Sequence, residues 1–234
     1  MIVLATFMAV LGSMAIWWLS HQRLTSKPWL EVGCTPTAAP EREQKASTPT
    51  TGLRLFFAVA ACLFTLLFSA SLMRSEAPDW SPVPLPELFW FNTAVLIASS
   101  LALQWTLHAA RRDAMEEVRA GLLMAFGCTL IFLAGQSSLW WQLAFDGYRV
   151  ASNPASAFFY LISAVHGMHV LGGLVALARA GAKSWNGAGT KKSLVALSLC
   201  ASYWHFLLMV WIVFVLLLAG WVEEVAALCR RIIT

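Results

Sequence analysis

The sequence contains few charged residues. Of its 234 residues, only 12% are Asp, Glu, Lys or Arg, whereas 59% are hydrophobic and the mean hydropathy is +0.68. A typical soluble domain has about 25% charged residues. Five long runs contain no charged residue: 55–73, 88–109, 120–143, 156–178 and 194–222. Since about 20 apolar residues cross the hydrocarbon core as a helix, the sequence predicts a polytopic helical membrane protein.

The sequence also lacks the motifs of several enzyme and transporter classes. It has no Gly-rich phosphate loop with its lysine, no H-E-x-x-H pair and no nucleophile elbow. No carboxylate lies inside the runs, which argues against an ion-coupled transporter acting alone. The five cysteines have no C-x-x-C spacing, and Cys62, Cys128 and Cys200 lie in apolar runs. We expect them to be small buried hydrophobic residues, not a disulfide framework or a metal site.

The expected fold class is all-α, with about six transmembrane helices. Residues 2–20 form a further apolar run, and basic residues follow it instead of preceding it, so it predicts a retained anchor and not a secretory signal. The next segment is rich in Pro, Thr and Ser and predicts a flexible linker. The expected domains are an anchor (1–20), a cytoplasmic linker (21–53), a five-helix membrane domain (54–222) and a short tail (223–234).

The basic residues predict the orientation of the spans. Of the 16 Lys and Arg residues, all but Arg74, Arg149, Arg230 and Arg231 lie in the segments before the second, fourth and sixth spans. By the positive-inside rule these three segments are cytoplasmic, and both termini are expected in the periplasm. Because basic residues set orientation in a membrane protein, the net charge of +4 does not indicate a nucleic-acid partner.

The run 156–178 combines two histidines with glycines. His166 and His169 are three residues apart and so share one helix face, and Gly173 lies on nearly the same face. Gly172, Ala176 and Ala180 form a stripe of small residues on which another helix can approach closely. This run is therefore predicted to be an interface helix.

His205, in the last run, is expected at about the same depth as His166, roughly 15 Å into the membrane at 1.5 Å per residue. Three interpretations of the deep histidines are open: interhelical hydrogen bonding and packing, a lipid-linked or proton-linked role, and haem or metal ligation. The last is disfavoured, because a two-haem helical cytochrome needs four histidines in two pairs. Candidate hydrogen-bond partners at this depth are Gln136, Tyr160, Ser163 and Tyr203.

Three stretches resemble a known family. Residues 132–177 (FLAGQSSLWWQLAFDGYRVASNPASAFFYLISAVHGMHVLGGLVAL) and 203–218 (YWHFLLMVWIVFVLLL) resemble the last three helices of subunit III of haem-copper terminal oxidases. Residues 85–112 resemble that family's N-T-x-x-L-x-x-S-S helix and its basic end. The most specific parts are H-G-x-H-V-x-G-G at 166–173 and Y-W-H-F at 203–206. The sequence thus resembles a bacterial cytochrome c oxidase subunit III.

The resemblance implies a non-catalytic subunit of an aerobic respiratory oxidase in the bacterial inner membrane. Such a subunit has no cofactor of its own except bound phospholipid; haems and copper belong to partner subunits. It packs on subunit I, assembles with subunit II and small subunits, can join a respiratory supercomplex, and supports proton uptake and stable oxygen reduction. Together with the spacing, the resemblance implies structural or lipid-adjacent roles, none catalytic or metal-binding, for Asn92, Gln136, His166, His169, Gly173, Tyr203, Trp204 and His205.

Two features depart from the family pattern. Many members have seven spans, whereas here one span precedes the five-helix unit. Members also commonly have a glutamate in the first helix of the five, and this sequence has Ala60 at that position. The alternatives are a subunit III-like accessory subunit of a quinol oxidase or a nitric oxide reductase, and a stand-alone cytochrome.

Overall fold

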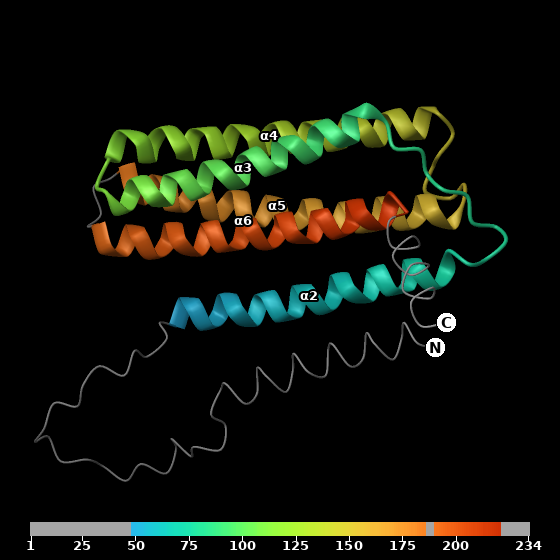
Figure 1. The fold of residues 1–234 in the computed structure, drawn as a ribbon, viewed down its shortest axis with the longest axis horizontal. Coiled ribbons are helices and arrows are strands. Elements are labelled where there is room, and N and C mark those ends of the chain that lie inside the picture. Colours follow the sequence, from blue (N-terminus) through green and yellow to red (C-terminus); the bar gives the residue numbers. More distant parts are fainter. Residues whose placement is uncertain (1–47, 186–189, 221–234) are drawn as a thin grey trace, which may run out of the picture. The chain divides into compact units, whose positions relative to one another are not determined.

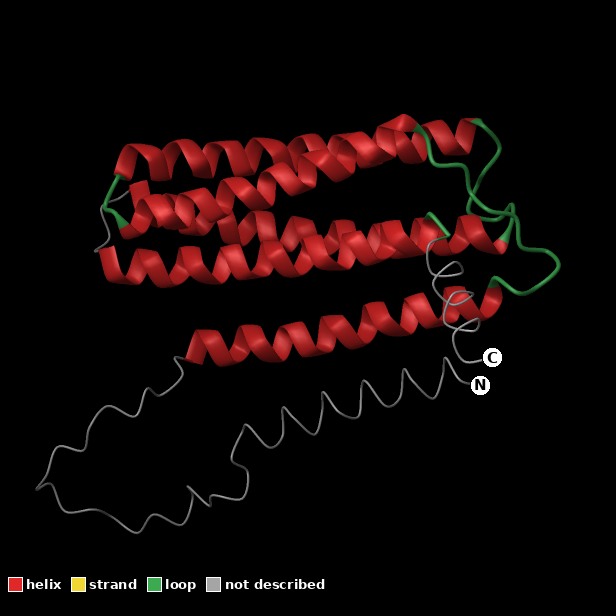
Figure 2. Ribbon diagram, viewed as in Figure 1, coloured by secondary structure: helices red, strands yellow, loops and turns green. Residues whose placement is uncertain are grey.

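The computed structural model describes residues 48–185 and 190–220 (Figure 1). The described residues form helices and loops and contain no strand (Figure 2). The helices are α2 (Thr48–Arg74), α3 (Glu87–Arg111), α4 (Met115–Phe145), α5 (Pro154–Trp185) and α6 (Thr190–Leu218). All five are long and apolar enough to span a membrane. This confirms the all-α class and the five spans after residue 54, whereas the expected span 2–20 and tail 223–234 lie outside the described residues.

The ends of the helices follow local sequence signals. Asn153 caps α5, because its Oδ1 accepts a hydrogen bond from the backbone N–H of Ser156 at 3.0 Å, and Pro154 takes the first helical position. Asp113, between α3 and α4, has a φ of 57°, which aspartate tolerates better than most residues. α6 ends before the expected residue 222, and Gly220 follows it with a φ of 74°.

Successive helices run in opposite directions (Figure 1). The loops 75–86 and 146–153 therefore lie at one end of the bundle, as the alternation of spans predicts. In the first of these loops, the Arg74 guanidinium donates a hydrogen bond to the Asp79 carboxylate and lowers the pKa of Asp79. This exposed ion pair joins the loop to the end of α2.

α3 and α4 pack closely because two glycines of α4 leave room for polar side chains of α3. A Cβ atom on Gly121 would collide with the Thr106 hydroxyl, and one on Gly135 would collide with the Asn92 amide. Between these two positions, the hydroxyls of Ser99 and Thr129 lie 3.0 Å apart. Such small-residue contacts are a common way for membrane helices to approach one another.

Aromatic side chains form the centre of the bundle. The Trp211 ring of α6 lies 5.1 Å from Phe132 of α4 and 5.6 Å from Phe89 of α3. Its indole N–H donates to the Thr93 hydroxyl at 3.0 Å. α2 joins this core through Ala60, Phe64 and Phe68, which are all buried. The core thus connects all five described helices.

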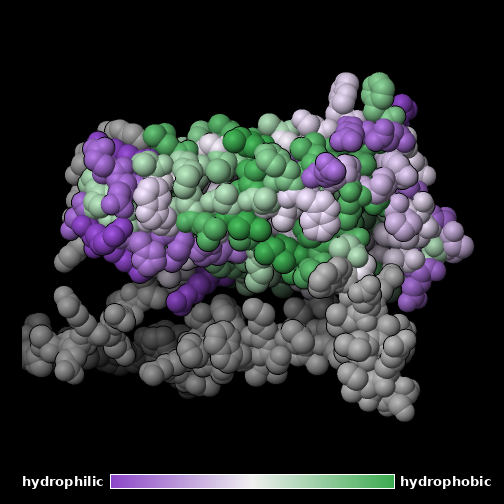
Figure 3. Space-filling model, turned by 45° about the horizontal axis from the view of Figure 1, so that its top comes forward, coloured by the Kyte–Doolittle hydropathy of each residue, from purple (hydrophilic) through white to green (hydrophobic). Residues whose placement is uncertain are grey.

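The outer surface is apolar along the spans. Large hydrophobic side chains are exposed on every described helix, and Figure 3 shows hydrophobic residues over the middle of one face, with hydrophilic residues gathered mainly at its two ends. Exposing such an apolar surface to water costs free energy, whereas lipid tails or another membrane subunit can cover it. The expectation that the cysteines of the spans are buried is confirmed only for Cys200. Cys128 is half-buried, and Cys62 is exposed on α2, where a thiol behaves as a small hydrophobic group.

Gly173 lies where α5 meets α6. A Cβ atom at Gly173 would lie 2.6 Å from Cε1 of Tyr203 and 2.9 Å from Cζ3 of Trp204. Gly172 differs, because no atom of the described residues lies within 4 Å of a Cβ placed there. Within the described residues, the helix contact on α5 therefore involves Gly173, and the side of Gly172 stays open to a helix of another chain.

We predict that Gly173→Ala weakens the α5–α6 contact. The added methyl group has no space, and overpacking typically costs about 1–3 kcal/mol. Gly167→Ala is the matched control on the same helix, since its Cβ would meet no atom of the described residues within 4 Å and alanine is the better helix former. Unfolding of both variants in mixed micelles measures the difference. Equal stability of the two variants would show that the contact at Gly173 is not tight.

Candidate functional site

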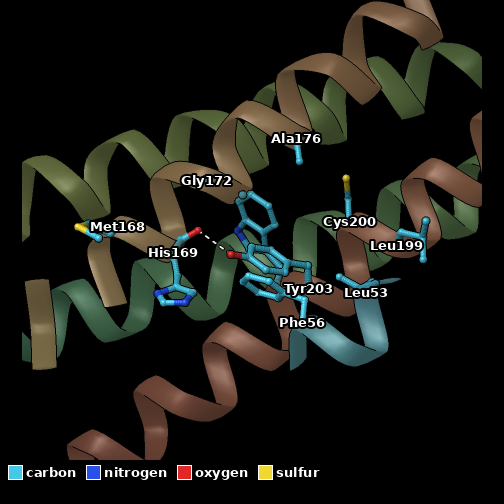
Figure 4. A pocket seen from close by; sticks show the side chains of 11 residues that line it. Leu53, Phe56, Met168, His169, Gly172, Ala176, Leu199, Cys200 and Tyr203 are labelled. Atoms are coloured by element: carbon cyan, nitrogen blue, oxygen red, sulfur yellow. Dashed lines mark hydrogen bonds between the residues drawn. The ribbon is translucent and has the colours of Figure 1, made fainter. Parts of the chain in front are cut away.

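An apolar groove lies between α2, α5 and α6 (Figure 4). Its volume is about 520 Å³. The lining residues are Leu53, Phe56, Met168, His169, Gly172, Gly173, Ala176, Leu199, Cys200, Tyr203 and Trp204. Gly172 and Ala176 have too little side chain to fill this space. The small-residue stripe of α5 thus leaves a hollow in a surface that would face the membrane.

Two polar side chains border the groove. The Nδ1 atom of His169 lies 2.7 Å from the carbonyl oxygen of Val165, so Nδ1 carries the proton of the neutral ring and Nε2 is an acceptor. The Tyr203 hydroxyl donates to the carbonyl oxygen of His169 at 2.8 Å (Figure 4). The His169 ring also lies 5.8 Å from Phe56 and 5.3 Å from Phe64. The groove therefore offers a mostly apolar wall with an imidazole at its edge.

His166 points into the core instead. It is only 1% exposed, and its ring lies 5.0 Å from Trp211 and 6.0 Å from Phe132. Neither ring nitrogen has a hydrogen-bond partner among the described residues. The side-chain nitrogen and oxygen atoms of Asn92 and Gln136, which are also buried, share this property.

His205 belongs to a third environment, on the outer side of α3 and α6. Its Nδ1 lies 2.5 Å from the Ser100 hydroxyl, and its Nε2 lies 3.1 Å from Oε1 of Gln104. Since an amide oxygen only accepts, Nε2–H donates to Gln104, and Nδ1 of the neutral ring accepts from Ser100. The Gln104 amide nitrogen lies 3.4 Å from Nε2 of His108. We call Ser100, Gln104, His108 and His205 the polar strip.

The three deep histidines lie in three different environments. One is in the core, one borders the groove and one is exposed in the polar strip. Residues 48–185 and 190–220 contain no group of three or more His, Cys, Asp or Glu side chains placed to hold a metal ion. The arrangement therefore gives no geometric support to the haem or metal interpretation.

Three of the four expected hydrogen-bond partners of the histidines bond elsewhere, and the fourth, Gln136, has none among the described residues. Tyr203 meets the backbone of His169 and not its ring. The Trp140 indole N–H donates to the Ser163 hydroxyl at 3.1 Å, and the Tyr160 hydroxyl lies 3.1 Å from the Trp140 carbonyl oxygen. Trp204 is buried, and its indole N–H donates to the Ser99 hydroxyl at 3.0 Å.

Several polar residues for which the sequence predicted no role are hydrogen-bond partners in the structure. They are Thr93, Ser99, Ser100, Gln104 and Thr129. Three of them lie in the segment read as N-T-x-x-L-x-x-S-S, so the polar residues of that apolar helix were the available signal.

Comparison with known proteins finds a matching family model and several similar chains. The family model described as "Cytochrome c oxidase subunit III" matches residues 46–223. "Probable cytochrome c oxidase subunit 3" of Mycobacterium tuberculosis (strain ATCC 25618 / H37Rv) is 35% identical over 160 residues, covering 65% of this chain and 75% of the relative. "Cytochrome c oxidase subunit 3" of Synechocystis sp. is 32% identical over 176 residues, covering 71% and 72%.

A plant relative extends this similarity. "Cytochrome c oxidase subunit 3" of Triticum aestivum is 27% identical over 172 residues, covering 69% of this chain and 64% of the relative. The residues of this chain that the family model matches include all five described helices. The chain therefore belongs to the cytochrome c oxidase subunit III family.

Proposed function

We propose that this chain is the non-catalytic third subunit of a bacterial aerobic terminal oxidase, with cytochrome c as electron donor. The observation that carries this proposal is the family match over 46–223, which spans the five-helix unit. In this proposal the protein lies in the inner membrane with both termini in the periplasm, and the haems and copper belong to partner subunits. Its own polar side chains position helices, lipids and partners.

We further propose that the groove between α2, α5 and α6 holds an acyl chain of a phospholipid. Its lining is almost entirely apolar, and its position on the outer side of the helices makes it accessible from the hydrocarbon core. Gly172 and Ala176 provide the depth. A flexible hydrocarbon chain suits this irregular surface, whereas a charged headgroup would find no counter-charge in the lining.

The polar strip supports the proposal that α3 and α6 together contact another subunit. His205 is exposed and Gln104 is half-buried, and both lie within spans. A polar side chain near the middle of the membrane is costly against lipid tails, and headgroups do not reach that depth. The neighbouring side chains Leu101 and Trp105 are also exposed and would add apolar contact area. We assign this surface to the haem-bearing subunit I, with subunit II and small subunits elsewhere in the assembly.

The support for proton uptake is proposed to be indirect. Ala60 is buried beside the aromatic residues of α2 and carries no ionisable group. The runs that form the spans contain no carboxylate. We therefore propose that the chain supports proton uptake by keeping subunit I and its lipids in place, not by carrying protons itself.

We predict that the tagged full chain, isolated from its native membrane in mild detergent, brings a haem-copper oxidase with it. Haem and copper spectra and oxygen uptake with reduced cytochrome c measure this. Isolation with a quinol-oxidising or nitric oxide-reducing complex would favour the alternative assignment. A haem spectrum from the chain expressed alone would overturn the non-catalytic role.

Filling the groove should displace lipid. We predict that Gly172→Phe lowers the amount of phospholipid that remains with the isolated oxidase and shortens its working life during turnover. Val175→Phe is the control, because Val175 is exposed on the same helix but does not line the groove. Lipid mass spectrometry and sustained oxygen-uptake traces compare the two variants. Unchanged lipid content in Gly172→Phe would contradict the lipid site.

The partner surface can be located by photo-cross-linking. A photoreactive amino acid in place of Leu101, beside the polar strip, should form an adduct with the haem-bearing subunit. The same amino acid in place of Val175, beside the groove, should react with lipid and not with that subunit. Mass spectrometry of the adducts identifies the lipid or subunit with which each position reacts. Reaction of the second position alone with the haem-bearing subunit would place the partner on the groove side.

A further inference from the structure

Three unpartnered polar side chains lie at one level of the bundle, on three different helices. A Cβ atom on Gly135 would collide with the Asn92 amide, so Asn92 of α3 lies beside the residue that precedes Gln136 of α4. The hydrogen bond from Trp140 to Ser163 sets the register of the antiparallel helices α4 and α5. Gln136 precedes Trp140 by four residues, and His166 follows Ser163 by three. Because α4 and α5 are antiparallel, both steps lead the same way along the bundle, so Gln136 and His166 lie at about the same height.

Aromatic side chains of the core connect the positions of these three residues. The Phe132 ring, one turn from Gln136, lies 6.0 Å from the His166 ring. Trp211 lies 5.0 Å from His166, and its indole N–H bonds Thr93, the neighbour of Asn92. Asn92, Gln136 and His166 are 0%, 4% and 1% exposed. The three side chains, on α3, α4 and α5, are thus buried around the core residues Phe132 and Trp211.

None of their polar atoms has a hydrogen-bond partner within the described part of the chain. The atoms are Nδ2 and Oδ1 of Asn92, Nε2 and Oε1 of Gln136, and Nδ1 and Nε2 of His166. Buried polar groups in native proteins are nearly always hydrogen-bonded, either to protein or to ordered water. The hydroxyls of Ser99 and Thr129, each about two helical turns away along its helix, pair with each other instead.

The chemistry of these atoms fits neutral water. Two amides and a neutral imidazole provide both donors and acceptors, and a water molecule can both donate and accept. Water fits better than an ion, because the runs that form these helices contain no charged residue to balance the charge of an ion. A buried water typically makes about three hydrogen bonds, so six polar atoms suit about two waters.

We propose that Asn92, Gln136 and His166 form a binding site for internal water within the bundle. Gly135 is part of the site, because a larger residue would push the Asn92 amide out of position. The bound water joins α3, α4 and α5 by hydrogen bonds that the side chains do not make with one another. This inference concerns the chain itself and does not depend on the proposed oxidase function.

The first test is a map of the full chain, alone in a lipid nanodisc or in its native complex, at a resolution that shows ordered water. We expect solvent density within hydrogen-bond distance, about 2.7–3.2 Å, of at least two of the three side chains. The cluster of Ser99, Thr129 and Trp204, which is paired internally, is the control and should show none. Direct bonds among Asn92, Gln136 and His166 without solvent density would overturn the proposal.

A double-mutant cycle gives a second readout. Gln136→Met and His166→Phe each remove a ligand of the water, so each should lower the thermal midpoint of unfolding. Once one ligand is lost the water is poorly held, so the double variant should lose less than the sum of the two single losses. Additive losses would show that the two side chains do not share a ligand. If a variant fails to fold, the map of the unaltered chain still decides.

Discussion

Hydrocarbon offers no hydrogen bonds, and this constraint determines where each polar side chain of the spans lies. The chain meets it in different ways. Ser99, Thr129 and Trp204 bond one another inside the bundle. Ser100, Gln104 and His205 bond one another on its outer side. Each set links two or three helices, so the same bonds that satisfy polar groups also fix which helices are neighbours. The polar residues of this protein are therefore part of its architecture.

Close approach of helices makes these bonds possible. Ser99 of α3 reaches Thr129 of α4 because Gly121 and Gly135 on either side bring the two backbones together. Between α5 and α6, Gly173 admits the rings of Tyr203 and Trp204. Trp204 then reaches Ser99, which connects α6 to the α3–α4 pair. The small residues at these positions and the polar contacts thus depend on each other.

Much of this fold could be predicted from the sequence. The absence of charge over five long runs is sufficient to locate the described spans, because charge is excluded wherever a helix crosses lipid. The helix ends were less predictable: α2 begins at Thr48, inside the segment expected to be a linker, and α6 ends at Leu218. Sequence hydropathy does not report where backbone hydrogen bonding stops, and polar residues can continue a helix beyond the membrane.

The environments of the histidines were less predictable than their depth. The spacing of His166 and His169 correctly gave one shared side of α5, since both rings lie near Phe64. However, the bundle closes over His166 and leaves His169 at the groove, a distinction that depends on where α2 and α6 pack. The pairing of His205 with Ser100 joins residues 105 positions apart and depends on the register of two helices. Periodicity within one helix contains no information about that register.

The hydrogen bonds of His169 and His205 favour structural roles for them over proton transfer. A relay needs a partner that accepts a proton and then releases it. His169 instead donates to the backbone carbonyl of Val165, and His205 donates to the Gln104 amide oxygen. Neither oxygen is basic enough to hold a proton at neutral pH, so these bonds fix the tautomer of each ring and orient it. These bonds therefore orient the imidazole of His205 between two helices and that of His169 within α5 at the groove.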